Sequence, residues 1–205
     1  MNKNKKRISI ILNILIVIFE LCGLYLNFKN NSRISIEFYT EDANVLAFFS
    51  SLLLIGYLLF NKKIPDWVKK FKYYTTIGLT ITLLVVLFVL IPMGDFNFKL
   101  YLFDGVMFFH HTICPILALV SFLFYDDLGK IERSDIIGGL GFTILYSIVL
   151  IILNLYDLVK GPYPFLMIKN QTIIASIIWF ILIYALAYFI AYYLRVLYTK
   201  FNRGK

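Results

Sequence analysis

The stretch YTTIGLTITLLVVLFVLIPM, residues Tyr74–Met93, decides the fold because it carries no charged residue along its whole length. A helix needs about 20 apolar residues to cross the hydrocarbon core of a bilayer, so this stretch predicts a membrane-spanning helix. Five further windows have a similar apolar character. The six predicted spans are residues Ile8–Asn27, Ala43–Phe60, Tyr74–Met93, Val106–Tyr125, Ile136–Tyr156 and Ile173–Leu194.

The composition excludes most classes of soluble protein. Of the 205 residues, 60% are hydrophobic and 16% are charged, whereas a soluble domain has about 45–50% apolar residues. Mean hydropathy is +0.81. Despite the net charge of +8, a soluble enzyme or nucleic-acid-binding protein is excluded. A β-barrel is excluded too, because its strands alternate over ~10 residues. We predict an all-α polytopic membrane protein, with residues 1–205 forming one six-transmembrane-helix bundle.

The distribution of positive charge predicts the orientation of the bundle, because cytoplasmic loops are enriched in Lys and Arg. Fifteen of the 20 basic residues fall on the side that carries both termini, and five fall on the other side. Both termini are therefore expected in the cytoplasm. The abundance of Ile, Lys and Asn favours a bacterial plasma membrane. The five basic residues on the outer side are Lys29, Arg33, Lys99, Lys160 and Lys169.

Three polar residues of the first span lie on one helix face. Asn13, Glu20 and Asn27 are spaced seven residues apart, so their side chains point in one direction. Polar side chains within a membrane are costly and usually face the bundle interior. Glu20 could tie helices together as a hydrogen-bonded carboxyl, or it could orient a histidine or gate a proton. Asp126 and Asp127, after the fourth span, are expected to reach water.

The fourth span contains two adjacent histidines, His110 and His111. Consecutive helix residues point about 100° apart, so the two side chains cannot serve one site in the same way. Each could be a structural histidine or a catalytic base. A metal site is disfavoured, because a chelating pair on one helix has i, i+4 spacing. Cys114 is expected to pack in the core, and Pro115 is expected to kink the helix.

The second span begins with the polar run Thr40-Glu41-Asp42-Ala43-Asn44. Acidic residues suit the first turn of a helix, and threonine is a common N-cap. Thr40 is therefore either an N-cap or a nucleophilic or substrate-binding hydroxyl. Asn44 lies one turn further in, where its amide could donate hydrogen bonds.

The loop before the last span contains Gly161-Pro162-Tyr163-Pro164-Phe165. Two prolines flank an aromatic residue, so the loop is expected to be stiff and extended. Tyr163, Pro164 and Phe165 could cap the outer mouth of the bundle. Under the predicted topology, this loop lies in the same outer half as Glu20, Thr40 and the histidines, which favours a site there.

The runs Phe38-Tyr39-Thr40 through Asn44, His111-Thr112-Ile113-Cys114-Pro115 and Tyr163-Pro164-Phe165 resemble the androgen-induced six-helix membrane hydrolases and their uncharacterised bacterial relatives. In that family a membrane-embedded threonine and histidine are the proposed catalytic pair, and animal members hydrolyse fatty-acid esters of hydroxy fatty acids. The resemblance implies Thr40 as the threonine and His111 as the histidine, with His110 as the alternative. A related branch resembles phospholipid acyltransferases that use a cysteine, which keeps Cys114 chemistry open.

The leading hypothesis is an intramembrane lipid ester hydrolase or acyl-transfer enzyme. His111 would deprotonate Thr40, Glu20 would orient the imidazole, and Asn44 is a candidate oxyanion donor. The expected partner is a membrane lipid or fatty-acid ester, with no nucleic acid, no metal and no organic cofactor. The alternative is a small transporter or lipid-binding membrane protein in which Glu20 and the two histidines line a proton or substrate path.

The orientation can be tested by labelling. Cysteines introduced at Asn31 or Asp95 should react with a membrane-impermeant thiol reagent in intact cells, because both positions lie on the predicted outer side. A cysteine at Lys62, on the predicted cytoplasmic side, should react only after lysis. The reverse pattern would invert the orientation and the predicted depth of the site.

Overall fold

The computed structural model describes residues 2–31 and 37–202, and all regular secondary structure within them is helical. Six helices are long and apolar enough to cross a membrane, which confirms the prediction of an all-α integral membrane protein. The six are α1 (Lys3–Asn31), α2 (Tyr39–Leu59), α3 (Asp66–Val85, continued to Met93), the helix Phe108–Tyr125 that contains α6 (Cys114–Val120), α7 (Ser134–Leu155) and α8 (Ile173–Asn202).

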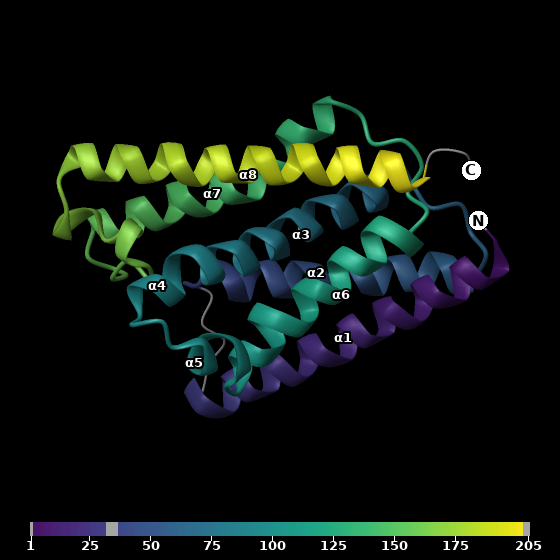
Figure 1. Cartoon of the computed structure of the whole chain (residues 1–205), viewed down its shortest axis with the longest axis horizontal. Helices are drawn as coiled ribbons and strands as arrows, with labels where there is room; N and C mark the ends of the chain where they lie inside the picture. Colours follow the sequence, from purple (N-terminus) through teal and green to yellow (C-terminus); the bar gives the residue numbers. More distant parts are fainter. Residues whose placement is uncertain (1, 32–36, 203–205) are drawn as a thin grey trace.

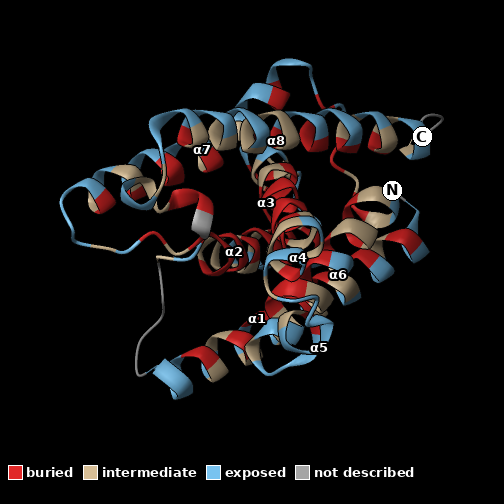
Figure 2. Cartoon of the chain, turned by 60° about the vertical axis from the view of Figure 1, so that its left-hand side comes forward, coloured by how far each residue is buried: buried red, intermediate tan, exposed pale blue. Residues whose placement is uncertain are grey.

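The helices run roughly along one axis, and both termini lie at the same end of the bundle, which we call the terminal end (Figure 1). The short helices α4 (Ile91–Met93) and α5 (Phe98–Phe103) lie at the opposite, distal end. Helix α3 is central and contacts α2, α6, α7 and α8. In Figure 2, α3 is largely buried, whereas α8 exposes a continuous outer face. That exposed face is apolar, as lipid contact requires.

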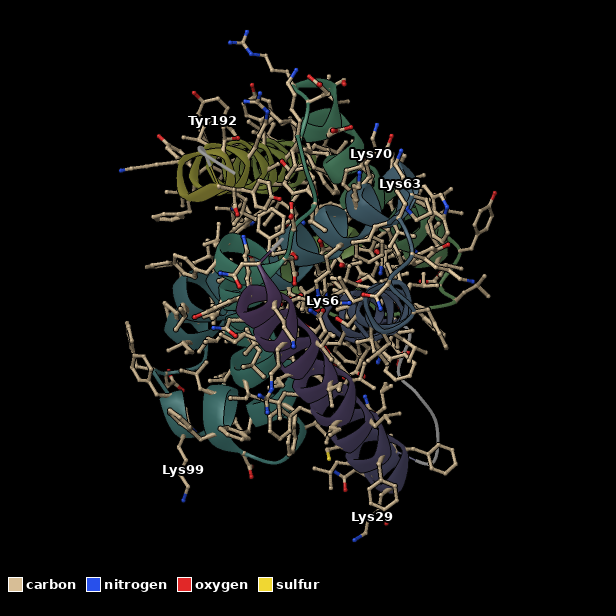
Figure 3. The ribbon with its side chains drawn as sticks, turned by 90° about the vertical axis from the view of Figure 1, so that its right-hand side faces the viewer. Lys6, Lys29, Lys63, Lys70, Lys99 and Tyr192 are labelled. Carbon is tan, nitrogen blue, oxygen red and sulfur yellow. The ribbon has the colours of Figure 1, made fainter. Side chains whose placement is uncertain are left out.

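The helices extend beyond the predicted spans, because hydropathy marks only the lipid-facing core. Helix α3 begins at Asp66 instead of Tyr74. Asp66 suits the positive end of the helix dipole and pairs with Lys69 at 2.9 Å. At the terminal end, Lys63 and Lys70 lie at the periphery of the bundle (Figure 3).

Two π-helical segments, η1 (Val86–Leu90) and η2 (Phe108–Ile113), precede prolines. Pro92 and Pro115 lack an amide proton, and each ring would collide with the carbonyl four residues earlier. A π turn shifts the hydrogen bonding by one residue and accommodates the ring without breaking the helix. Directly before Pro115, where the sequence predicts a bend, the helix changes its hydrogen-bonding register in the π-helical segment η2. Both histidines lie in this segment.

Asp126 does not reach water, contrary to the sequence-based expectation. It lies after the π-helical segment η3 (Ser121–Tyr125) and is fully buried. Its Oδ1 accepts hydrogen bonds from Ser9 Oγ at 2.6 Å, Ser121 Oγ at 2.9 Å and Asn13 Nδ2 at 3.0 Å. These contacts fasten α1 to the fourth spanning helix near the terminal end.

Replacing Asp126 should therefore destabilise the bundle. Asp126→Ala removes the acceptor of the buried Ser9 and Ser121 hydroxyls and one of the three acceptors of Asn13 Nδ2, which should cost about 2 kcal/mol or more and lower the thermal unfolding temperature in detergent. Asp66→Ala is the matched control, because Asp66 is exposed and its ion pair is with Lys69, three residues further along the same helix; its unfolding temperature should change little. Equal unfolding temperatures for the two variants would contradict a structural role for the Asp126 contacts.

Candidate functional site

Thr40 lies in the first turn of α2, at the distal end. In this turn, backbone amides that have no partner within the helix donate hydrogen bonds to tyrosine hydroxyls. The N-cap residue is Phe38, not Thr40. The Tyr39 amide donates to the Tyr146 hydroxyl at 3.0 Å, and the Thr40 amide donates to the Tyr163 hydroxyl at 3.4 Å. The Thr40 side chain is thus not used for capping, and its Oγ1 lies 3.5 Å from the Tyr163 hydroxyl.

The loop that supplies Tyr163 is a turn and not an extended segment. The Leu166 amide donates to the Tyr163 carbonyl at 2.9 Å, which closes the 3₁₀ turn η4 (Pro164–Leu166). The rings of Tyr163 and Phe165 stack with centroids 5.2 Å apart, and both residues are buried. Burial raises the pKa of Tyr163 to about 12, so its hydroxyl keeps its proton at neutral pH. The side chain of Pro164 lies outside the described part of the structure.

Thr40 and Tyr163 lie between two hollows of different character. One is an almost wholly apolar pocket between α3, α7 and α8, with Ile81, Trp179 and Ile183 in its wall. The other is a cleft of about 780 Å³ at the distal end. Most of its surface is apolar, but its lining also includes Asn27, Asn31, Tyr101, Asp104 and His111. Thr40 and Tyr163 line both hollows.

His111 faces the distal cleft and is held by a backbone carbonyl. Its Nδ1 lies 2.8 Å from the Tyr101 carbonyl oxygen. Since a carbonyl can only accept, Nδ1 carries the proton and Nε2 is left as the basic nitrogen. Thr112 reinforces this contact, because its hydroxyl donates to the Leu102 carbonyl at 2.8 Å. Helix α5 therefore fixes the tautomer of His111.

His110 is enclosed between two carboxylates. Its Nδ1 lies 3.1 Å from Glu41 Oε1, and its Nε2 lies 3.6 Å from Glu20 Oε2. The imidazole is fully buried. Glu20 thus faces His110 and not His111. From the sequence, Glu41 is recognisable only as an acid in the first turn of a helix. The helical spacing of Thr40, Asn44, Ala47 and Ser51 would have placed it next to the inward face.

Asn44 and Cys114 support the site without facing the cleft. The Asn44 side-chain amide donates to the Thr40 carbonyl at 2.7 Å and to the His110 carbonyl at 3.3 Å. It therefore fastens α2 to the histidine segment, and its donors are not directed at a substrate. The Cys114 thiol is buried beside the Glu20 carboxyl.

The structure brings Thr40 and His111 to one cleft without joining them. Within residues 2–31 and 37–202, no hydrogen bond links Thr40 to either histidine, and no group of three His, Cys, Asp or Glu residues could hold a metal ion. Comparison with protein-family models, with curated proteins and with solved structures gives no match. The resemblance to the androgen-induced hydrolases therefore rests on the three sequence motifs alone.

The close packing of His110 gives a sharp mutational test. The imidazole lies directly over Gly23, so an added Cβ would overlap it, whereas a Cβ at Gly56 meets open space. Gly56→Ala should stabilise α2 by up to about 1 kcal/mol. Gly23→Ala should destabilise the protein by about 1–3 kcal/mol, measured by thermal unfolding in detergent. The Gly23→Ala/His110→Ala double variant should recover part of that loss. Equal stabilisation by both alanines would mean that His110 does not occupy this position.

Proposed function

We propose that this chain is an intramembrane enzyme that hydrolyses or transfers the acyl group of a lipid ester, with Thr40 as the nucleophile. One observation carries the proposal: Thr40 lines both an almost wholly apolar pocket inside the bundle and the larger distal cleft, whose wall also carries polar residues. An ester lipid has the same division, an acyl chain joined at the reacting carbonyl to a polar group.

The two hollows match the two parts of such a substrate in polarity. The pocket has a volume of about 50 Å³, so the side chains that line it would have to move apart to take a long acyl chain. The acyl chain would enter the pocket beside Trp179 and Ile183, where burial of each methylene contributes about 0.8 kcal/mol. The polar part would remain in the cleft, near Asn27 and Asp104. The ester carbonyl would then lie at Thr40, between the two.

The residues around Thr40 supply the groups that acyl transfer needs. A neutral hydroxyl is a weak nucleophile and requires a base, and His111 Nε2 is the free basic nitrogen of the cleft. Thr40 Oγ1 would bond to the carbonyl carbon as its proton moves to Nε2, and the imidazolium would protonate the departing alkoxide. Water, deprotonated by the same nitrogen, would release the acid. The Tyr163 hydroxyl, 3.5 Å from Thr40 Oγ1, would donate to the oxyanion.

The distribution of Lys and Arg adds to this proposal an orientation of the site relative to the two leaflets of the membrane. With both termini in the cytoplasm of a bacterial cell, the distal end opens toward the outer leaflet. The substrate would then be a lipid ester that enters from that leaflet, and its water-soluble product would leave on the outer side.

The test is hydrolysis of a panel of lipid esters by purified protein. Thr40→Ala and His111→Ala should each lower turnover by about 100-fold or more, and the double variant should be about as inactive as either single variant, because the two residues act in one step. His110→Gln is the matched control, because His110 does not line the cleft.

The competing outcomes are distinct. Losses that simply add in the double variant would show that Thr40 and His111 do not share a step. An inactive, folded His110→Gln beside an active His111→Ala would assign the base to His110. A wild-type protein that cleaves no ester, and that no serine or threonine hydrolase probe labels, would remove the enzyme proposal.

A further inference from the structure

Five ionisable side chains form a buried series through the centre of the bundle. They are Asp126, Lys72, Glu20, His110 and Glu41, and none is more than 6% exposed. We propose that this series is a proton path between the terminal end and the distal cleft, and that the protein conducts protons across the membrane. This proposal does not depend on ester chemistry, because no lipid ester takes part in it.

Glu20, His110 and Asp126 belong to α1 and to the fourth spanning helix with its C-terminal end, while Lys72 comes from α3 and Glu41 from α2. The buried face of α1 carries Ser9, Asn13, Glu20 and Asn27. The opposing helix presents Ser121, Cys114 and His110, all fully buried. The polar face of α1 thus packs against the polar face of the fourth spanning helix. This packing keeps both faces out of the lipid, where exposure of polar side chains costs free energy. Within the described residues, some buried polar atoms of this interface, such as Asn13 Oδ1 and His110 Nε2, have no hydrogen-bond partner.

Lys72 is the member of the series whose burial costs the most free energy. It is 1% exposed, and the only hydrogen bond of its ammonium within the described residues joins it to Ser51 Oγ at 2.9 Å. Asp126 and Glu20 are the carboxylates whose charges act on it, although neither lies within ion-pair distance. Because Lys72 contacts neither carboxylate, a proton could pass between them only through bridging water.

His110 connects Glu20 to the distal cleft. A proton leaving the Glu20 carboxyl can bind Nε2, 3.6 Å away, while the proton on Nδ1 passes to Glu41, 3.1 Å away. A flip of the imidazole then exchanges the positions of its two nitrogens and restores the first tautomer, so that one proton has moved from Glu20 to Glu41 and the ring has neither lost nor gained one. Glu41 lines the cleft and can release the proton there. His111, whose Nδ1 is bound to the Tyr101 carbonyl, is not a member of the path.

Water can bridge the intervals between these side chains. Ser9 binds Asp126, and Glu20 lies eleven residues further along α1, or about 16 Å on a helix. Among the described residues, Asn13 Oδ1 and Asp126 Oδ2 are buried without a hydrogen-bond partner, and the Glu20 carboxylate has only long contacts with His110 and Cys114. Buried waters occupy sites that offer them two to four such partners.

Proton flux can be measured in proteoliposomes that contain a pH-sensitive dye. A potassium gradient with valinomycin supplies the driving potential, and no ester is present. Wild-type vesicles should acidify faster than protein-free vesicles. Glu20→Gln keeps the shape of the side chain but cannot accept and release the proton, so its flux should fall to the protein-free rate. Lys72→Met should do the same. Lys70→Met is its matched control, because Lys70 is half exposed and paired with Asp135.

The outcomes separate this path from the ester proposal. Wild-type flux equal to that of protein-free vesicles, or undiminished flux in folded Glu20→Gln, would overturn the path whatever the hydrolysis assay gives. If Lys72→Met fails to fold, Glu20→Gln and His110→Gln decide the question, with folding verified by thermal unfolding. Loss of flux in Lys70→Met would indicate a nonspecific effect of removing positive charge and would also contradict the proposal.

Discussion

The structure depends on one constraint: a carboxyl group in the middle of a membrane-spanning helix must face other protein groups. Glu20 imposes this on α1, and Ser9, Asn13 and Asn27 lie on the same buried face. Because a polar group left in hydrocarbon costs several kcal/mol, the rotation of α1 about its axis is fixed. The fourth spanning helix must then present its own polar face, which contains His110 and Ser121.

The distal site follows from this packing. Once His110 lies between Glu20 and Glu41, the first turn of α2 is brought against the histidine segment, and Asn44 fastens the two. The next residue, His111, then points toward the cleft and α5. The two adjacent histidines thus have different environments: His110 is enclosed by two carboxylates, and His111 lines the cleft. The π turn before Pro115 sets the register that makes this possible.

The sequence was sufficient for the spans, the inward face of α1 and the polar character of the distal end, because all three follow from hydropathy and helical period. It was not sufficient for Glu41, Lys72 and Asp126. Each lies beside a charged or polar neighbour near a predicted helix end, where an exposed residue and a buried one have the same sequence pattern. Only the neighbouring helices decide which of them is buried. The pairing of Glu20 with His110 likewise required the rotation of two helices.

The proposed function requires that the apolar pocket and the distal cleft, both lined by Thr40, hold one lipid. An experimental density map of the protein in lipid nanodiscs, without added ligand, is the decisive measurement. Elongated density should appear in the pocket beside Trp179, continuous with density for a polar group between Thr40 and His111. An empty pocket, with acyl chains only on the outer surface of the helices, would contradict it.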